Sequence, residues 1–290
     1  MIRIDRRHFL GSAAALALAP RAHANPLGLP LGLQLYTVRD AIAKDFTGTL
    51  EAVKRIGYAK IQTNMSLAGR DTAQLKQAFD AVGLAWDTAH CSNAEFLTEL
   101  PRTIEKAKAV GLRYLVTSVP LFPANFRDVV TGVSADAWKR NAELLNKVGG
   151  EIAKAGLVFG YHNHNPEFRK YDGVTAYDML LKETDPALVK LELDIGWMVS
   201  GGYDPAQYLV RDPGRYIILH VKDLTRDFIP NYQTRMTGKP AGSGIVDWKR
   251  VFAAARRAGI KGLYVEQEKP YQASPLEDAK AAFDYLSRLK

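Results

Sequence analysis

The stretch "GEIAKAGLVFGYH" (Gly150–His162) contains the pattern that decides the fold of this chain. Its first half suits a helix, and Gly156 follows as a residue that can end one, because glycine adopts the left-handed conformation of a helix C-terminus without penalty. The run Leu157–Tyr161 is short and apolar, which is typical of a parallel strand covered on both faces. The stretch therefore predicts a helix, a glycine turn and a buried strand that ends at His162.

The same pattern of a helical segment, a glycine and a short apolar run occurs four more times. The four copies are "EAVKRIGYAKIQT" (51–63), "QAFDAVGLAWDTAH" (77–90), "EKAKAVGLRYLVTS" (105–118) and "AAARRAGIKGLYVE" (253–266). Three further strand candidates are "LGLQLYTVRD" (31–40), "VKLELDIG" (189–196) and "RYIILHVKD" (215–223). Eight β/α units in about 250 residues predict an α/β protein with the (β/α)8 TIM barrel fold.

The chain is expected to form one domain over residues 25–290. No linker, low-complexity tract or change of composition divides this part of the sequence. The main alternative fold is a doubly wound open sheet. No G-x-G-x-x-G turn follows the first strand candidate, which argues against the dinucleotide-binding form of that fold.

Residues 1–24 have the character of an export signal. Arg6–Arg7 precede the apolar run "SAAALALAP" (12–20), and the small-residue triplet "AHA" ends at Ala24, where we expect cleavage. The apolar run is too short to span a bilayer. The arginine pair with Phe9–Leu10 resembles a twin-arginine signal, and an ordinary Sec signal is the alternative. Both predict a periplasmic protein, and the first implies the twin-arginine export machinery as a partner.

Charge and cysteine content argue against several classes of protein. The net charge of +8 falls to +5 without residues 1–24, because that segment holds four basic residues and one acidic residue. No block of lysine and arginine occurs, so we expect no nucleic-acid partner, and we also expect no stable membrane anchoring. The single cysteine, Cys91, excludes an internal disulfide and fits a packed apolar position. Pairing into a homo-oligomer is left open.

Histidines and acids gather at the ends of the strand candidates. The histidines outside the export signal are His90, His162, His164 and His220. The acids at the same level are Asp194, Glu266 and Glu268. Barrel enzymes carry their chemistry at the C-terminal ends of the strands, and imidazole and carboxylate groups together suit a divalent ion. We therefore expect one Mn²⁺, Co²⁺, Zn²⁺ or Mg²⁺ ion, with buried ion pairs at the barrel mouth as the alternative.

Six segments, taken in order, resemble the xylose isomerase-like TIM barrels, also known as the sugar phosphate isomerase/epimerase, endonuclease-IV-like or AP endonuclease 2-like superfamily. The segments are "GLQLYTVRD", "YHNHNPEF", "ELDIGWMVSGGYDP", "LHVKDL", "GSGIVDW" and "YVEQE". The resemblance implies one divalent metal held by Glu, Asp, His and Glu on strands five to eight. Asp194, His220 and Glu266 match the last three places, whereas His162 stands where the family usually has a glutamate.

The histidine-rich segment 161–168 carries the expected acid and base groups. The alternation of a strand points His162 and His164 to the same side, toward the barrel mouth. We expect His162 to complete the metal site, while His164 and Glu167 stand outside it as acid, base or substrate-binding groups. Glu268, at the end of the last strand, is a further candidate base.

Other side chains are expected to bind the substrate. Lys222 would neutralise an enolate oxygen, and an ion pair with Asp223 or Asp194 is an equal alternative. The expected substrate-binding residues are Gln34, Tyr36, His90 and Trp197. The first two could bond sugar hydroxyl groups, and the tryptophan could offer a flat face to a sugar ring. The glycine-rich segment "TGKPAGSG" (237–244) lacks the lysine ending of a phosphate loop and predicts a mobile rim loop.

The resemblance implies a metal-dependent enzyme that acts on a sugar, a keto-sugar or a cyclitol. It would remove a proton next to a carbonyl group that the metal polarises, and then isomerise, epimerise or eliminate. The histidine at position 162 favours a dehydratase or lyase over an epimerase that uses two glutamates. The alternative is a metal-free sugar-binding barrel without catalysis. An endonuclease-IV-like nuclease would need a basic groove and more histidines than the four available.

Overall fold

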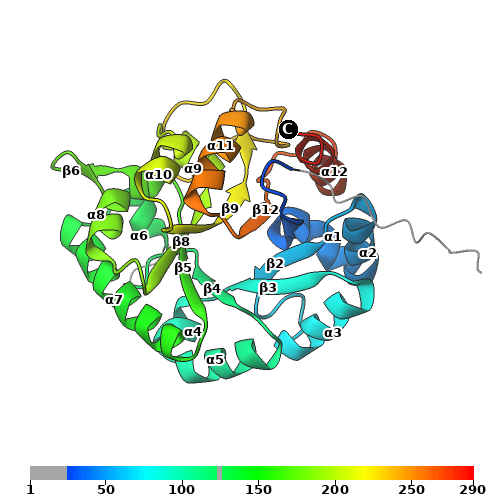
Figure 1. The fold of residues 1–290 in the computed structure, drawn as a ribbon, viewed down its shortest axis with the longest axis horizontal. Helices are drawn as coiled ribbons and strands as arrows, with labels where there is room; N and C mark the ends of the chain where they lie inside the picture. Colours follow the sequence, from blue (N-terminus) through cyan, green and yellow to red (C-terminus); the bar gives the residue numbers. More distant parts are fainter. Residues whose placement is uncertain (1–24, 123–125) are drawn as a thin grey trace, which may run out of the picture.

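The structure, a computed structural model, describes residues 25–122 and 126–290. Eight parallel strands close into one barrel in the order β1-β12-β9-β8-β5-β4-β3-β2, with helices around it (Figure 1). The predicted (β/α)8 TIM barrel is therefore confirmed. The expected export signal at residues 1–24 lies outside the described residues.

All eight strand candidates are strands of the barrel. They are β1 (Leu31–Gln34), β2 (Lys60–Asn64), β3 (Ala85–His90), β4 (Tyr114–Thr117), β5 (Val158–His162), β8 (Val189–Asp194), β9 (Tyr216–Val221) and β12 (Gly262–Val265). The strand register places His220 opposite Asp194 in the β8–β9 pair and Glu192 opposite His162 in the β5–β8 pair. Polar residues of neighbouring strands thus lie at the same level of the barrel.

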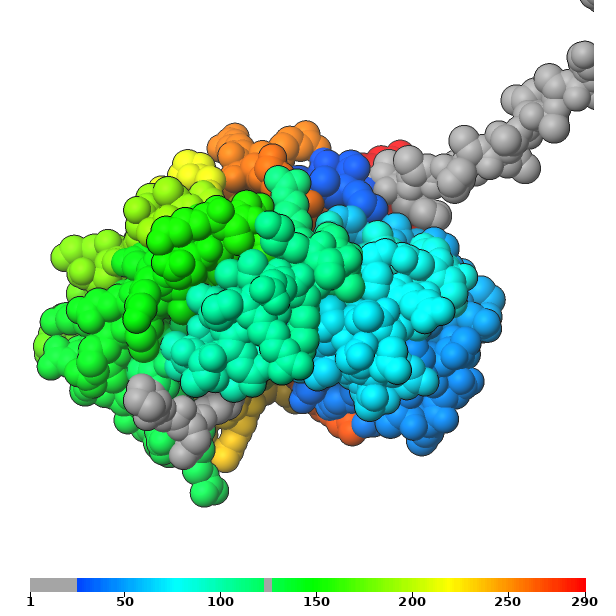
Figure 2. All heavy atoms as spheres, turned by 90° about the horizontal axis from the view of Figure 1, so that it is seen from below, coloured from blue at the N-terminus to red at the C-terminus, as the bar shows by residue number. Residues whose placement is uncertain are grey.

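Helices form the outer wall, and Figure 2 shows the side on which α3, α5 and α7 lie next to one another. The longer helices are α2 (Phe46–Ile56), α3 (Thr72–Val82), α5 (Leu100–Ala109), α7 (Ala135–Lys154), α8 (Ala176–Glu183), α11 (Trp248–Ala258) and α12 (Pro275–Leu286). The shorter ones are η1 (Leu35–Val38), α1 (Arg39–Lys44), α4 (Asn93–Leu97), α6 (Phe126–Thr131), η2 (Pro166–Phe168), α9 (Ile195–Ser200) and α10 (Pro205–Arg211). Within the described ranges, none of the helices combines the length and apolarity needed to cross a membrane.

Glycine ends the helices as the sequence predicts. α3 begins with a capping box, in which the side chains of Asp71 and Gln74 each accept a hydrogen bond from the backbone of the other. It ends at Gly83 with a φ of 70°, and α11 ends at Gly259 with a φ of 77°. Side chains are disfavoured at these φ values, so glycine stands where the chain turns back toward the next strand.

The barrel interior changes from apolar to charged along its axis. Tyr114, Ile218 and Tyr264 pack together at the N-terminal end. A Cβ on Gly32 would lie 2.4 Å from the ring of Tyr264, so glycine makes room for this layer. Inward side chains recur at every second residue, and His220 therefore follows Ile218 on the inner face of β9. The main apolar core, which includes the buried Cys91 as expected, lies between the strands and the outer helices.

One carboxylate holds the rim segment 240–246 in place. Asp223 accepts hydrogen bonds from the indole N–H of Trp248 at 2.9 Å and from the backbone N–H groups of residues 242, 244, 245 and 246 at 3.0, 3.3, 3.0 and 3.1 Å. A Cβ on Gly244 would lie 2.1 Å from Oδ1 of Asp223, so only glycine fits there. The rim loop expected from "TGKPAGSG" therefore follows a fixed path.

Two small antiparallel pairs complete the fold. β10 (Asp223–Leu224) pairs with β11 (Gly238–Lys239) beside this rim segment. β6 (Lys170–Tyr171) pairs with β7 (Val174–Thr175) as a hairpin before α8. Both pairs lie outside the barrel sheet and extend the loops at its edge.

Candidate metal centre

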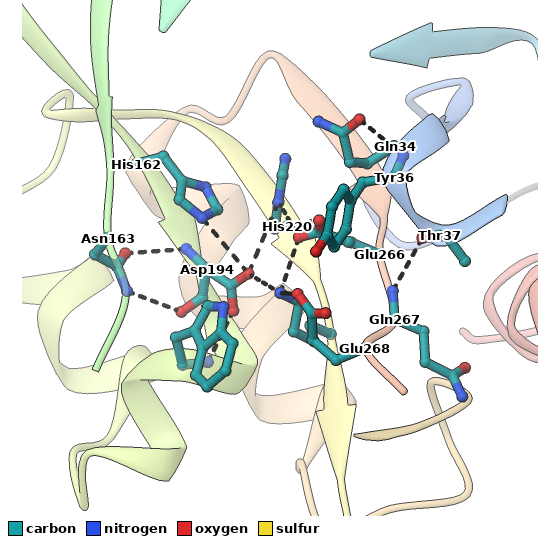
Figure 3. A network of polar contacts seen from close by, with 12 residues as sticks. Gln34, Tyr36, Thr37, His162, Asn163, Asp194, His220, Glu266, Gln267 and Glu268 are labelled. Carbon is teal, nitrogen blue, oxygen red and sulfur yellow. Dashed lines mark hydrogen bonds and ion pairs between the residues drawn. The ribbon is translucent and has the colours of Figure 1, made fainter. Parts of the chain in front are cut away.

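Four side chains converge at the C-terminal end of the barrel (Figure 3). They are His162 at the end of β5, Asp194 at the end of β8, His220 in β9 and Glu266 directly after β12. One nitrogen or oxygen atom of each lies within 4.8 Å of the corresponding atoms of the other three, and all four residues are buried. The structure thus brings together the four side chains that the sequence predicts as metal ligands.

Asp194 is oriented by the backbone around it. Its Oδ1 accepts a hydrogen bond from the N–H of Trp197 at 2.8 Å and caps the N-terminus of α9. The side chain of Asn163 donates to the carbonyl of Asp194 and accepts from its N–H, which joins the ends of β5 and β8. The other oxygen, Oδ2, lies 4.0 Å from Nε2 of His162 and 3.8 Å from Nδ1 of His220. One oxygen therefore holds the helix while the other faces the cluster.

The donor set fits a divalent ion. Two imidazole nitrogens and two carboxylate oxygens are donor types that Zn²⁺, Mn²⁺ and Co²⁺ accept. Glu266 contributes Oε2, which lies 2.9 Å from Nδ1 of His220. Burial of an ionised carboxylate costs free energy unless a cation neutralises it. Asp194 and Glu266 are two buried carboxylates that face the same point.

Lys222 lies beside the cluster and is 1% exposed. Its Nζ is 3.0 Å from Oδ2 of Asp194, 2.9 Å from Oε2 of Glu266 and 3.4 Å from Oε1 of Glu268. Burial opposes the charged form of Lys222, but the three carboxylates outweigh burial and raise its pKa above the ordinary value. The sequence suggests Asp223 or Asp194 as the ion-pair partner of Lys222. The structure shows the pair with Asp194, whereas Asp223 binds the rim segment.

The charges of the cluster also act on His220. Burial opposes protonation of its ring, but Glu192 and Glu266 outweigh burial and raise its pKa to about 10. The same environment raises the pKa of Asp194 to about 6, through burial and then the charge of Glu266. In the metal-free protein at pH 8, His220 therefore carries a proton on an atom that a metal would need, and Asp194 is ionised.

Binding of a divalent ion at pH 8 should accordingly release about one proton. A metal can occupy Nδ1 of His220 only after the proton shared with Glu266 has left, and metal ligands must be deprotonated. Calorimetric titration with Zn²⁺ in two buffers of different ionisation enthalpy measures this number. Heats that do not depend on the buffer would contradict the expectation.

A polar cavity of about 250 Å³ lies beside the cluster, with His162 and Glu266 in its wall, and a cleft of about 470 Å³ adjoins it. The cavity is lined by Gln34, Tyr36, Asn64, His90, Ser118, His162, His164, Lys222, Glu266 and Glu268. The cleft is lined by Tyr36, His164, Trp197, Thr234, Arg235, Met236, Glu268 and Lys269. Together the two spaces are of the size at which proteins bind small molecules.

The four expected substrate-binding residues face these two spaces. Gln34 and His90 line the cavity, Trp197 lines the cleft, and Tyr36 lines both. Tyr36 is 49% exposed at the mouth, where the guanidinium of Arg39 lies 3.9 Å from its ring centroid. Trp197 is buried under the cluster, and its ring lies 4.9 Å from the ammonium group of the nearby lysine. Their roles in substrate binding stay predictions.

His164 also lines both the cavity and the cleft. Its ring packs against those of His162 and Trp197 at centroid distances of 5.0 and 5.6 Å. Burial lowers the pKa of His164 well below its ordinary value, and His162 and Lys222 lower it further. The ring is therefore neutral at pH 7 and able to accept a proton. Glu268, the second candidate base, lines the same two spaces.

Glu167 lies elsewhere. It is fully buried, and its Oε1 accepts a hydrogen bond from the hydroxyl of Tyr161 at 2.8 Å. Neither residue lines the cavity or the cleft. Burial raises the pKa of Glu167 to about 7, although the bond from Tyr161 opposes the shift. The structure therefore gives Glu167 no direct contact with the cluster, and its catalytic role stays an untested prediction.

Glu167→Gln should make the stability of the fold less dependent on pH. The pKa of Glu167 is 4.5 in the unfolded chain and about 7 in the folded protein, so between these pH values the folded protein binds a proton that the unfolded chain has lost. The stability that this proton contributes is fully present below pH 4.5 and is lost as the pH rises through 7. Glutamine stays neutral throughout. The difference in free energy of unfolding between the variant and the parent should therefore shift by about 3 kcal/mol in favour of the variant from pH 4.5 to pH 8. Urea unfolding at both values measures this gain. An identical pH profile in both proteins would contradict the expectation.

The site also contains polar residues that the sequence does not single out. Glu192 is fully buried and contacts His90, His162 and His220 at 2.7, 2.9 and 3.0 Å. Gln62 donates a hydrogen bond to Glu192 at 2.6 Å. The sequence signal for Glu192 is its position two residues before Asp194 on the same strand, which gives both the same inward face.

The end of segment 161–168 supports the rim on the other side of the cleft. Asn165, fully buried, accepts a hydrogen bond from the N–H of Thr234 at 2.9 Å and donates one to Ser200 at 3.2 Å. Thr234 has a φ of 52°, a conformation that a non-glycine residue adopts only when its surroundings hold it. Asn165 therefore fixes the loop that carries Arg235 to the cleft.

A closed parallel barrel with a buried cluster of two histidines and two acids at its C-terminal end defines a TIM-barrel enzyme with a metal-type site. The chain belongs to the xylose isomerase-like TIM barrel family, whose profile matches residues 50–289. The resemblance drawn from the six sequence segments is thereby confirmed at the level of the family.

Individual relatives agree with this assignment. Inosose dehydratase of Geobacillus thermodenitrificans is 29% identical over 275 residues, which cover 80% of this chain and 89% of that protein. A sugar phosphate isomerase/epimerase of Parabacteroides distasonis is 25% identical with a TM-score of 0.73, over 90% of this chain and 98% of the other. A zinc-bound IOLI protein shares the fold at 16% identity and a TM-score of 0.66, over 90% of this chain and 99% of that one. The chain is an enzyme of the isomerase/epimerase-like group.

Proposed function

We propose that the protein is a metal-dependent enzyme that removes a proton next to a carbonyl group of a sugar, a keto-sugar or a cyclitol, and then eliminates a neighbouring substituent. The observation that carries the proposal is a cluster of four metal-type donors, two of which (His162 and Glu266) line one polar cavity together with Lys222 and His164. The similarity to inosose dehydratase supports an elimination. The similarity to a sugar phosphate isomerase/epimerase supports a sugar-like substrate.

Each group around the cavity has a role in this reaction. The four donors would hold a divalent ion, which supplies Lewis-acid polarisation of the substrate carbonyl when bound. The ammonium group of Lys222 would stabilise the negative charge that develops on a substrate oxygen. The neutral ring of His164 would accept the proton from carbon. Glu268, next to Lys222 at the mouth, is placed to orient a substrate hydroxyl group.

The bonds and protons of a dehydration balance with these residues. A C–H bond and a C–O bond break, a C=C bond forms, and the oxygen leaves as water after it takes up one proton. His164 carries the proton from carbon and can return it to the leaving oxygen if both bonds lie on the same face of the substrate. The side chains then end the cycle in the protonation states in which they began it.

One observation favours the alternative of a metal-free sugar-binding barrel. The ammonium group of Lys222 already neutralises part of the charge of Asp194 and Glu266, at 3.0 and 2.9 Å. The metal content of the purified protein separates the two functions. One divalent ion per chain supports the enzyme, whereas none after dialysis against micromolar Zn²⁺, Mn²⁺ or Co²⁺ supports the binding protein.

Proton exchange in D₂O tests the proposed chemistry without knowledge of the final product. The metal-loaded protein is incubated with a panel of sugars, 3-keto-glycosides and cyclitol ketones, and deuterium uptake is followed by NMR. We expect uptake at a single carbon next to a carbonyl, and only with metal present. The absence of exchange and turnover across the whole panel would overturn the proposed function.

We also propose that the protein is exported to the periplasm through the twin-arginine pathway. The proposal rests on the sequence of residues 1–24, because these lie outside the described part of the structure. Export in the folded state would suit an enzyme that acquires its metal before it crosses the membrane.

Replacement of Arg6 and Arg7 together by lysine should trap the uncleaved precursor in the cytoplasm. The charge is kept, but the arginine pair is recognised by a receptor and not by charge alone. Cell fractionation with a size assay for cleavage after Ala24 measures the result. Normal periplasmic processing of the double variant would instead identify a Sec signal.

A further inference from the structure

Glu192 occupies the centre of a hydrogen-bonded group directly beneath the proposed metal ligands. Its Oε1 lies 2.9 Å from Nδ1 of His162, 3.0 Å from Nε2 of His220 and 2.7 Å from Nε2 of His90. Its Oε2 accepts a hydrogen bond from Nε2 of Gln62 at 2.6 Å. The carboxylate is fully buried.

The two proposed histidine ligands meet Glu192 and the metal-type cluster through opposite nitrogens. Nδ1 of His162 faces Glu192, whereas its Nε2 faces Oδ2 of Asp194 at 4.0 Å. Nε2 of His220 faces both Glu192 and Oε1 of Gln62, whereas its Nδ1 faces Glu266 at 2.9 Å. A neutral histidine carries its proton on one nitrogen only, and a carboxylate attracts that proton. In His162 only Nδ1 lies within hydrogen-bond distance of a carboxylate, so Nδ1 keeps the proton and Nε2 keeps the lone pair that a metal needs.

We infer that Glu192 is a positioning residue that selects the metal-binding nitrogen of His162 and helps to fix the orientation of the His162 and His220 rings. The inference rests on the proposed metal site. A carboxylate that accepts the second N–H of a histidine ligand fixes its tautomer and strengthens its bond to the metal. Here one carboxylate acts on two ligands at once, and His90 is a third ring held by the same oxygen.

Gln62 and Gln34 support Glu192 from below the cavity rim. Gln34 donates a hydrogen bond to Oε1 of Gln62 at 3.0 Å, and Gln62 in turn donates to Oε2 of Glu192. This chain of amides fixes which carboxylate oxygen faces the histidines. Both glutamines are buried, and Gln34 also lines the polar cavity.

The spacing of the atoms argues that Glu192 is not itself a ligand. His90, His162, Glu192 and His220 also form a group of four donors that lie within 4.8 Å of one another. Ligand atoms of a tetrahedral zinc ion stand ~3.3 Å apart, given Zn–N and Zn–O bonds of about 2.0 to 2.1 Å. The contacts of Glu192 to the three rings, at 2.7 to 3.0 Å, are all shorter and match hydrogen bonds. The contacts around Asp194 and Glu266, at 2.9 to 4.0 Å, bracket the metal spacing.

Glu192→Gln tests the inference, and Glu167→Gln is its matched control. Both substitutions remove one fully buried carboxyl group without a change of size, but only Glu192 contacts the ring nitrogens of His162 and His220. We expect Glu192→Gln to weaken Zn²⁺ binding 10- to 100-fold in competition with a chromogenic chelator, the effect usual for such orienting groups. Glu167→Gln should bind Zn²⁺ like the parent protein. Circular dichroism checks that both variants are folded.

Nitrogen-detected NMR of the metal-free protein gives a second measurement. We expect the parent to hold His162 with its proton on Nδ1, and Glu192→Gln to show a mixture of the two tautomers. Unchanged zinc affinity together with an unchanged tautomer would overturn the inference. A second zinc ion in the parent, lost in Glu192→Gln, would also overturn it, because Glu192 would then be a ligand.

Failure of the inference about Glu192 and failure of the proposed reaction give different results. Zinc binding that depends on Glu192 without any proton exchange from a substrate would reject the proposed reaction and keep the inference. Proton exchange from a substrate together with normal zinc affinity in Glu192→Gln would keep the proposed reaction and reject the inference. If the parent binds no metal, the tautomer of His162 still reports whether Glu192 directs its proton.

Discussion

Asp194→Ala and His220→Ala should each abolish stoichiometric binding of a divalent ion while the barrel stays folded. Each substitution removes one of four donors, and the first also leaves Glu266 paired with Lys222, whose ammonium group at 2.9 Å then competes with a metal. The apolar core lies between the strands and the outer helices, so the fold does not depend on this rim. Metal content per chain after dialysis, measured by mass spectrometry, gives the result, and circular dichroism checks the fold.

Asp204→Ala is the matched control for Asp194→Ala. Asp204 caps α10 through the N–H of Ala206 at 3.0 Å, much as Asp194 caps α9, but it lies outside the cluster. Loss of either cap should cost about 1 kcal/mol of stability. Only Asp194→Ala should also lose the metal. Full metal occupancy in both Asp194→Ala and His220→Ala would contradict the ligand assignment.

His164→Gln should lower turnover by about a hundredfold or more and leave the metal in place. Glutamine keeps much of the size and hydrogen-bonding capacity of histidine but cannot accept and return a proton, and a positioned base contributes about 10²- to 10⁴-fold. Because the ring is neutral at pH 7, its loss should be equally severe from pH 6 to 8. The rate constant kcat, measured with a substrate found by deuterium exchange, gives the size of the effect.

Two further measurements separate a proton carrier from a residue that only positions the substrate. In His164→Ala, added imidazole should restore part of kcat if the missing group is a base. A positioning role would instead raise KM, and imidazole would not help. Near-normal turnover in His164→Gln would exclude His164 as the base and leave Glu268 as the next residue to test.

The fold could be predicted almost completely because each β/α unit carries its own local signal. A helix, a glycine such as Gly156 and an apolar run lie within a dozen or so residues of one another, so no contact between distant segments has to be guessed. The rule that barrel chemistry lies at the strand ends then points to the histidines and acids there, and the resemblance to the family singles out Asp194, His220 and Glu266 among them. The closure of the strands into one barrel follows from their number.

The parts of the site that the sequence did not reveal depend on contacts across the barrel. Glu192 shares the inward face of Asp194, but only the strand register shows that it meets histidines from β3, β5 and β9. Strand alternation orients His162 and His164, and Glu167 is expected outside the metal site together with His164. That alternation stops at η2, where Pro166 begins a helical turn, and Glu167 consequently meets Tyr161.

The hydrogen bonds of Asp223 have a consequence for which substitutions this rim segment tolerates. The carboxylate accepts hydrogen bonds from main-chain N–H groups, so it fixes the path of segment 240–246 whatever side chains the segment carries. Substitutions at Ser243, Ile245 or Val246 leave those N–H groups in place, whereas Gly244 has no freedom to vary. Ser243 is exposed and can vary, whereas Ile245 is half-buried and Val246 packs against the apolar core, so packing and not the main-chain hydrogen bonds limits variation there.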